Sequence, residues 1–110
     1  MKRAKVYVDG VFAGWLEEVE KRKRYSFRYD PHYKGPSVSL EMPTTQNIYE
    51  YDCFPPFFEG LLPEGIMLVG LLRTGKLDQH DYMSQIIAVG HDLVGNVTVE
   101  ACDESLPDYI

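Results

Sequence analysis

Apolar and polar residues alternate through the first part of the chain, which is the pattern of strands with one buried face. Two alternating segments, residues 5–8 and 11–16, flank Asp9 and Gly10. This pair is typical of a two-residue hairpin turn, because both central residues of that turn need positive φ. The chain is therefore predicted to open with a β-hairpin.

The predicted turn also sets the register of the hairpin. A two-residue loop makes three opposite pairs, which are Val8 with Val11, Val6 with Ala13, and Ala4 with Trp15. Because side chains alternate between the two faces of a strand, these residues share one face, and Tyr7 and Phe12 lie on the other. The register predicts that Trp15 is a core residue.

The same alternation predicts further strands. A third strand is expected over residues 25–29, a short fourth strand over 38–42, and a brief extended piece over 48–51. A last strand falls within residues 93–101, where apolar and polar residues alternate again. No crossover helix separates the first four strands, so they are expected to pair antiparallel.

Residues 57–65 combine a helix start, a break and a second helix start, and we call this segment the knuckle. Pro55 and Pro56 stand just before it, in the entry turn, where a missing amide proton costs little. Pro63 is expected to end the short helix. Glu64 then carries negative charge into the next helix, where the helix dipole favours it, and Gly65 allows a close backbone approach. Such a segment is a shaped surface and not a generic core helix.

Two longer helices are expected after the knuckle. The first, over residues 66–75, is apolar on nearly every side, which predicts a helix covered by protein on most of its circumference, with Gly75 as its cap. Asp78 is expected to cap the second helix, which ends at Gly90.

These elements predict an α+β domain. Its sheet is mainly antiparallel, built from the N-terminal hairpin and meander plus the C-terminal strand, and its helices pack on one face. A length of 110 residues suits one domain, which we assign to residues 1–102. Residues 103–110 are expected to form a flexible tail.

Composition narrows the possible partners. The net charge of −6 argues against direct nucleic-acid binding, since neutralising phosphates requires clustered Lys and Arg. No apolar run approaches the roughly 20 residues needed to cross a bilayer, so no membrane partner is expected and the predicted location is cytoplasmic. Cys53 and Cys102 have no metal-site spacing and are predicted to be buried thiols.

The sequence contains no recognisable catalytic constellation. His32, His80 and His91 lack the spacing of a helical metal site, so solvated or capping roles are favoured for them. No serine or cysteine lies in a nucleophile motif. We therefore expect no enzyme activity, no metal and no cofactor.

The aromatic residues favour protein binding. Eight Tyr and five Phe are many for a small core, and exposed aromatic residues are enriched at protein interfaces. The candidates are Tyr33, Tyr49, Tyr51 and Tyr82. The alternative is that these rings only shield loops.

Several motifs occur in the order found in the N-terminal subdomain of HipA-type toxin kinases, and the sequence resembles that subdomain over roughly residues 5–100. The motifs are Asp9-Gly10, Gly14-Trp15-Leu16, residues 25–29, Val38-Ser39-Leu40, the Phe-Phe-x-x-Leu-Leu-Pro run of the knuckle, and residues 90–97. The Gly-rich loop, the ATP-positioning Lys and the catalytic Asp of a kinase cannot be assembled here. The chain is therefore similar to the stand-alone HipS-type proteins, which resemble the subdomain without its kinase.

The resemblance implies a role in a three-component HipBST-type toxin–antitoxin system. The expected partner is a separately encoded HipT-type Ser/Thr kinase toxin, of a family that inactivates aminoacyl-tRNA synthetases by phosphorylation. The leading interpretation is an antitoxin that binds and inhibits this kinase. A second is a non-inhibitory accessory subunit that completes the kinase fold or bridges it to a HipB-like helix-turn-helix protein, and a third is a solitary small-molecule-binding module.

The knuckle is the expected kinase-binding surface, because a rigid segment beside the nucleotide cleft would resist closure of the Gly-rich loop. The predicted partner-binding residues are Leu62, Pro63, Glu64, Gly65, Ile66 and Met67, with Tyr49 and Tyr51 as a second candidate surface.

Overall fold

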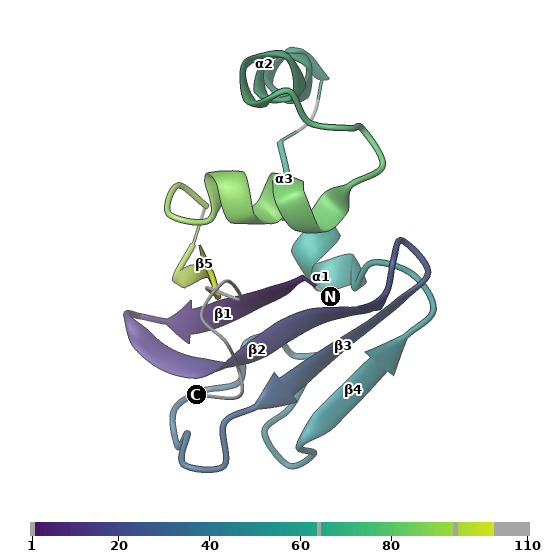
Figure 1. Ribbon diagram of the computed structural model, residues 1–110. Helices are drawn as coiled ribbons and strands as arrows, with labels where there is room; N and C mark the ends of the chain where they lie inside the picture. The colour runs from purple at the N-terminus through teal and green to yellow at the C-terminus, as the bar shows by residue number, and fades with distance from the viewer. Residues whose placement is uncertain (1, 64, 94, 103–110) are drawn as a thin grey trace, which may run out of the picture.

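The computed structural model describes residues 2–63, 65–93 and 95–102, and in this part of the chain five strands form one antiparallel sheet with three helices (Figure 1). The strands are β1 (Arg3–Val8), β2 (Val11–Glu20), β3 (Arg24–Tyr29), β4 (Ile48–Tyr51) and β5 (Val97–Ala101), and the helices are α1 (Pro56–Glu59), α2 (Gly65–Gly75) and α3 (Tyr82–Val89). The sheet order is β4-β3-β2-β1-β5. The predicted α+β class with a mainly antiparallel sheet is confirmed.

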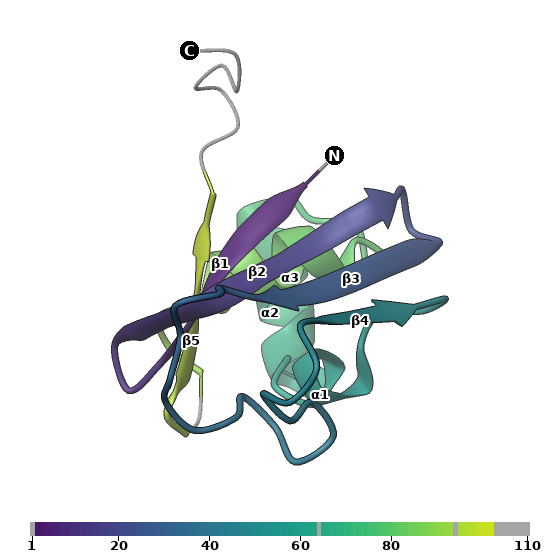
Figure 2. The same ribbon diagram turned by 90° about the horizontal axis from the view of Figure 1, so that it is seen from below.

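The helices lie on one face of the sheet in two tiers (Figure 1). α1 and α3 lie next to the sheet, and α2 lies beyond α3 and contacts it. Seen from below, the sheet lies in front and the helices behind it (Figure 2). Among the described residues, no helix lies on the other face of the sheet, which we call the open face.

The core lies between the sheet and the first tier of helices. Its fully buried side chains include Val6, Leu16, Phe27 and Val99 from the strands, Phe58 from α1, and Met83 and Ile86 from α3. Gly90 ends α3, as predicted, and lies against β5: Val99 N donates to Gly90 O at 3.0 Å. A Cβ atom at Gly90 would lie 1.8 Å from the Val99 carbonyl oxygen, so this close approach requires glycine.

The hairpin turn is confirmed, but the predicted register is wrong beyond it. Asp9 and Gly10 have φ of 52° and 82°, and Val8 pairs with Val11. A β-bulge between Val6 and Tyr7 then shifts the pairing by one residue, so that Val6 pairs with Gly14 and Ala4 with Leu16, and not with Ala13 and Trp15.

The bulge exchanges the faces of Trp15 and Leu16, so the prediction that Trp15 is a core residue is wrong. Leu16 is fully buried, whereas Trp15 is half-buried on the open face of the sheet. There its ring packs edge-to-face with the Phe12 ring, with 5.0 Å between the two ring centroids. The Arg28 guanidinium lies 4.3 Å from the centroid of the Trp15 ring. A one-residue shift moves every following side chain to the other face.

The predicted strand over residues 38–42 is wrong, because this segment is a loop. Its alternation still reflects burial: Val38 and Met42 are buried, while Leu40 is 99% exposed. The Tyr29 hydroxyl holds the loop against the core, since it accepts from Val38 N at 2.9 Å and donates to Met42 O. Hydrogen bonds from the Tyr29 side chain of β3 thus take the place of the backbone hydrogen bonds that would pair a strand with its neighbour.

The termini of the two longer helices also differ from the prediction. Asp81 and not Asp78 caps α3, and Asp78 Oδ1 instead accepts from His80 N at 2.7 Å within the preceding turn. Gly75 is the last residue of α2, and the left-handed residue after the helix is Lys76, with φ of 53°.

The cysteines are not both buried as predicted. Cys53 is exposed, because it lies in the bend after β4, and Cys102 is half-buried. Within the described residues no helix has the length and apolarity to span a membrane, and no group of three or more acidic, His or Cys side chains is placed to hold a metal ion.

Candidate functional site

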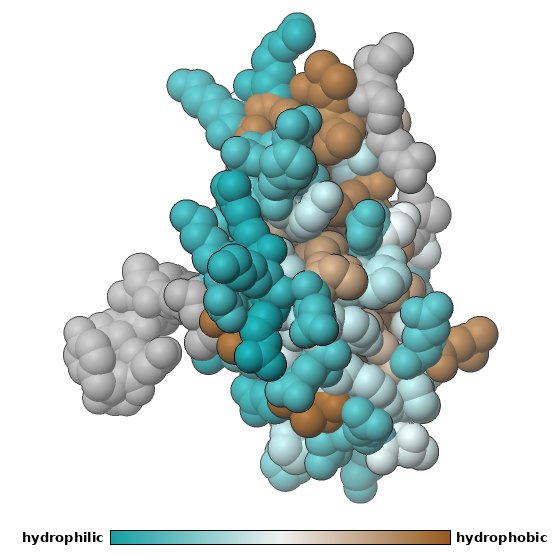
Figure 3. Space-filling model, turned by 90° about the vertical axis from the view of Figure 1, so that its right-hand side faces the viewer, coloured by the Kyte–Doolittle hydropathy of each residue, from teal (hydrophilic) through white to brown (hydrophobic). Residues whose placement is uncertain are grey.

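α2 carries apolar side chains into solvent. Met67 is 76% exposed and Val69 is 52% exposed. Figure 3 shows brown, apolar atoms at the top of the molecule, where α2 lies. The prediction that protein covers most of this helix is wrong, because no residue from Met67 to Gly75 is buried. Exposed apolar surface of this kind is typical of sites that bind proteins, membranes or ligands.

The knuckle is held in place by the core at its first half. Pro55 is the N-cap of α1, Pro56 is the first helical residue, and Phe58 is fully buried. The chain then turns through Gly60, whose amide donates to Pro56 O at 3.0 Å, and Leu62 is buried again. These contacts anchor the point from which α2 projects.

A hollow of about 520 Å³ lies on one side of α2. It is bounded mostly by apolar residues, among them Leu61, Leu62, Pro63, Met67, Leu71 and Leu93. Leu61, Leu71 and Leu93 are half-buried, so the hollow exposes carbon surface that a partner could cover. Burial of such surface contributes roughly 25 cal/mol per Å² to association.

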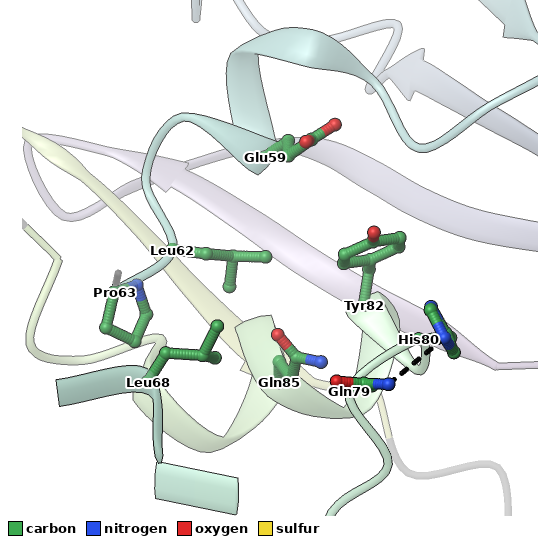
Figure 4. A pocket seen from close by; sticks show the side chains of 8 residues that line it. All are labelled: Glu59, Leu62, Pro63, Leu68, Gln79, His80, Tyr82 and Gln85. Carbon is green, nitrogen blue, oxygen red and sulfur yellow. Dashed lines mark hydrogen bonds between the residues drawn. The ribbon is translucent and has the colours of Figure 1, made fainter. Parts of the chain in front are cut away.

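A second hollow of about 310 Å³ lies on the other side of α2, between α1, the start of α3 and the α2–α3 connection (Figure 4). Its lining is more polar and includes Glu59, Gln79, His80 and Gln85. Leu62 and Pro63 line both hollows, so the knuckle forms the ridge between them.

The structure brings some of the predicted partner-binding residues together. Leu62, Pro63 and Met67 line the larger hollow, Gly65 begins α2, and Ile66 lies in the first turn of that helix. The prediction for Glu64 lies outside the described residues.

Tyr49 and Tyr51 are not part of this surface. They lie on β4, opposite Phe27 and Tyr25, and line neither hollow beside α2. Both rings are half-buried and pack against the core, and the Tyr49 hydroxyl donates to Pro43 O at 2.5 Å. Burial raises the pKa of Tyr51. The two predicted surfaces are therefore separate.

The sequence analysis missed Val69 and Leu71 of α2, and also Glu59 and Gln85 of the second hollow. A signal for the first two was present, since a helix that is apolar all round needs neighbours on every side. The predicted elements supplied one short helix, one longer helix and one sheet, which is too little to surround it. No sequence signal marks Glu59 or Gln85.

Asp81 fixes the start of α3 at the second hollow. Its Oδ1 accepts from Ser84 N at 3.2 Å, and Lys2 Nζ lies 2.6 Å from its Oδ2. Burial alone would raise the pKa of Asp81, but the hydrogen bonds from Lys2 and Ser84 outweigh burial and hold this pKa below its usual value.

We expect Asp81→Ala to lower the free energy of unfolding by about 0.5–2 kcal/mol at neutral pH, the usual effect of losing an N-cap. A lowered pKa stabilises the folded protein above the unfolded-state pKa, and this contribution is lost as the pH falls through the folded-state pKa. The difference between parent and variant should therefore shrink in acid. Urea unfolding at neutral and strongly acidic pH measures both effects, and an equal difference at the two pH values would contradict the assignment.

Comparison with known proteins identifies relatives along nearly the whole chain. The family model described as the HipA N-terminal domain matches residues 4–100. An uncharacterized protein of Haemophilus influenzae (strain ATCC 51907 / DSM 11121 / KW20 / Rd) is 28% identical over 100 residues, which cover 91% of this chain and 92% of the relative. The solved structure of the N-terminal domain of HipA toxin is 26% identical, with a TM-score of 0.73, and the match covers 94% of this chain and 95% of that one. The resemblance inferred from the motifs is confirmed.

Proposed function

The chain belongs to the HipA N-terminal domain family, and from this premise we propose that it is the antitoxin of a three-component HipBST-type toxin–antitoxin system. In this proposal it binds and inhibits a separately encoded HipT-type Ser/Thr kinase toxin. We further propose that it acts in the cytoplasm and that residues 1–102 form the domain that binds the kinase.

The observation that carries the proposal is the exposed apolar surface of α2. Met67 and Val69 stand in solvent, and the adjoining hollow of about 520 Å³ is lined by leucines and Pro63. Exposed apolar surface that adjoins a hollow is typical of a surface that is covered in a complex. Its position next to the anchored knuckle makes the surface rigid at one end, which limits the entropy lost on docking.

Inhibition by this surface would be steric and not chemical. The knuckle and the first turn of α2 would lodge beside the nucleotide cleft of the kinase and oppose closure of its Gly-rich loop, on which phosphoryl transfer depends. No phosphate-binding or metal-binding group of the antitoxin takes part.

Co-expression tests the proposal directly. The chain should co-purify with the kinase toxin encoded beside it, restore growth to cells that express this toxin, and lower kinase activity in a purified assay. Failure to form a complex would refute the proposal. A stable complex with undiminished kinase activity would instead assign the chain as a non-inhibitory subunit. The same assay with a HipB-like protein added separates direct inhibition from inhibition that needs this third component.

A further inference from the structure

The hollow on the second side of α2 contains a buried glutamine with one unpaired atom (Figure 4). Gln85 is 1% exposed, and its Nε2 donates to the Asp78 carbonyl oxygen at 2.9 Å. This hydrogen bond fixes the orientation of the amide, because a carbonyl oxygen can accept only from the nitrogen. The other end of the amide, Oε1, points toward the side of the hollow formed by Leu62.

Oε1 of Gln85 has no protein donor among the described residues. In the same part of the chain, every fully buried side-chain nitrogen or oxygen has a hydrogen-bond partner. Oε1 must therefore reach solvent, and the hollow that it lines is where it does so. An amide oxygen in an otherwise buried side chain is a fixed acceptor for a ligand that brings a donor.

The remaining lining suits a cation on an apolar stem. Glu59 is exposed at the edge, where no described residue forms an ion pair with its carboxylate. Leu62, Leu68 and the Tyr82 ring supply carbon surface, and this ring is held by stacking on Phe54 at 5.4 Å. None of the described residues in the lining is Lys or Arg.

We propose that this hollow takes an arginine side chain of the partner protein. A guanidinium group has several donors and no acceptor, so it can donate to Gln85 Oε1, and Glu59 at the edge of the hollow favours its positive charge. Its aliphatic stem would lie on the leucine and tyrosine surface. Phosphate or carboxylate ligands are disfavoured by Glu59 and by the net charge of −6. The identity of the partner as a kinase rests on the proposed function, whereas the preference of the hollow for a guanidinium group does not.

An NMR titration of the full chain tests this chemistry without a kinase. The probe is N-acetyl-arginine amide, and the matched control is N-acetyl-citrulline amide, in which a neutral urea of similar shape replaces the guanidinium. We expect saturable shifts of the Gln85 side-chain amide and of the Glu59 and Gln79 backbone amides with the arginine probe, and much smaller shifts with citrulline. Equal shifts from both probes, or no saturable shift from arginine, would overturn the proposal.

Two variants extend the test. Glu59→Gln should weaken arginine binding by about twofold to fivefold, the size expected for an exposed ion pair. Glu41→Gln is the control, because it makes the same charge change at an exposed residue outside the hollow. Equal affinities for both variants would show that Glu59 is not part of the site.

Binding of the variants to the kinase is the last test. Glu59→Arg should weaken kinase binding by about tenfold or more through like-charge repulsion, while Glu41→Arg should leave it nearly unchanged. A positive titration with no difference between these variants would mean that the hollow binds a cation other than the partner's arginine. If no complex forms at all, the proposed function fails, and the titration still decides the chemistry of the hollow.

Discussion

The double substitution Met67→Asp with Val69→Asp is expected to abolish high-affinity binding to the kinase toxin while leaving the fold intact. Both side chains are largely exposed, at 76% and 52%, so replacing them removes little core packing. An Asp that is desolvated at an interface costs on the order of 1–3 kcal/mol, so each substituted side chain that the kinase covers weakens a nanomolar complex by about one to two decades. Neutralisation of the toxin should be lost with binding.

The single variants show which side of α2 docks. Met67 and Val69 are two residues apart in a helix, so their side chains point about 200° apart. Met67 lines the larger hollow, whereas Val69 lines neither hollow. Whichever single Asp causes the larger loss identifies the flank that the kinase covers, and a larger loss from Met67→Asp is expected because of the apolar hollow beside it.

Leu40→Asp is the matched control for these variants. Leu40 is 99% exposed in the loop after β3, away from α2, so an Asp there adds the same one negative charge as each single variant without touching the proposed interface. Thermal melts check folding, and calorimetry and growth rescue check binding. If the folded double variant still neutralises the toxin as well as Leu40→Asp does, α2 is not the inhibitory surface, and Tyr49 and Tyr51 on β4 become the next candidates.

Leu16→Ala should cost about 2–5 kcal/mol of unfolding free energy, which is much of what a domain of this size possesses. Leu16 is fully buried opposite Ala4 on β1 and Phe27 on β3, and truncating it leaves a cavity between the sheet and the helices. Chemical denaturation should show a largely unfolded or strongly destabilised variant.

Trp15→Ala is the comparison that isolates the effect of the bulge. Trp15 loses a half-buried ring contact with Phe12 and the stacked guanidinium of Arg28, each worth about 0.5–1.5 kcal/mol. We therefore expect a smaller loss of stability than for Leu16→Ala. The opposite order would mean that the pairing of β1 with β2 lacks the bulge.

The hairpin illustrates how far local sequence rules reach. Asp9 and Gly10 specify the turn, because the turn needs positive φ at both central residues and these two residues tolerate it. The bulge, in which Ala13 is the extra residue of β2 opposite Val6 and Tyr7, has no such local signature. Neither Phe12 nor Ala13 has positive φ, and the pairing depends on strands β3 and β5 as well. The face of Trp15 could not be predicted without it.

The knuckle was predictable as a local segment, but the exposure of the helix that follows it was not. Phe58, Leu62 and Pro63 marked the knuckle because proline and apolar spacing act locally. The exposure of Met67 depends on which tier α2 occupies, which is a property of the whole fold. The prediction of a strand over residues 38–42 was wrong for the same reason, since the Tyr29 hydroxyl that holds this loop comes from another element.

The glycines of α2 have a consequence for the lifetime of the free protein. Gly70 lies in the middle of the helix, and a Cβ atom there would meet nothing within 4 Å, so packing does not require it. A glycine inside a helix costs about 1 kcal/mol relative to alanine, and a helix as short as α2 is marginal without tertiary support. We therefore expect α2 to open locally while the sheet stays folded, which exposes its backbone to proteases. A bound kinase would close this route, so that the toxin would prolong the life of its own inhibitor and unpartnered copies would be cleared first.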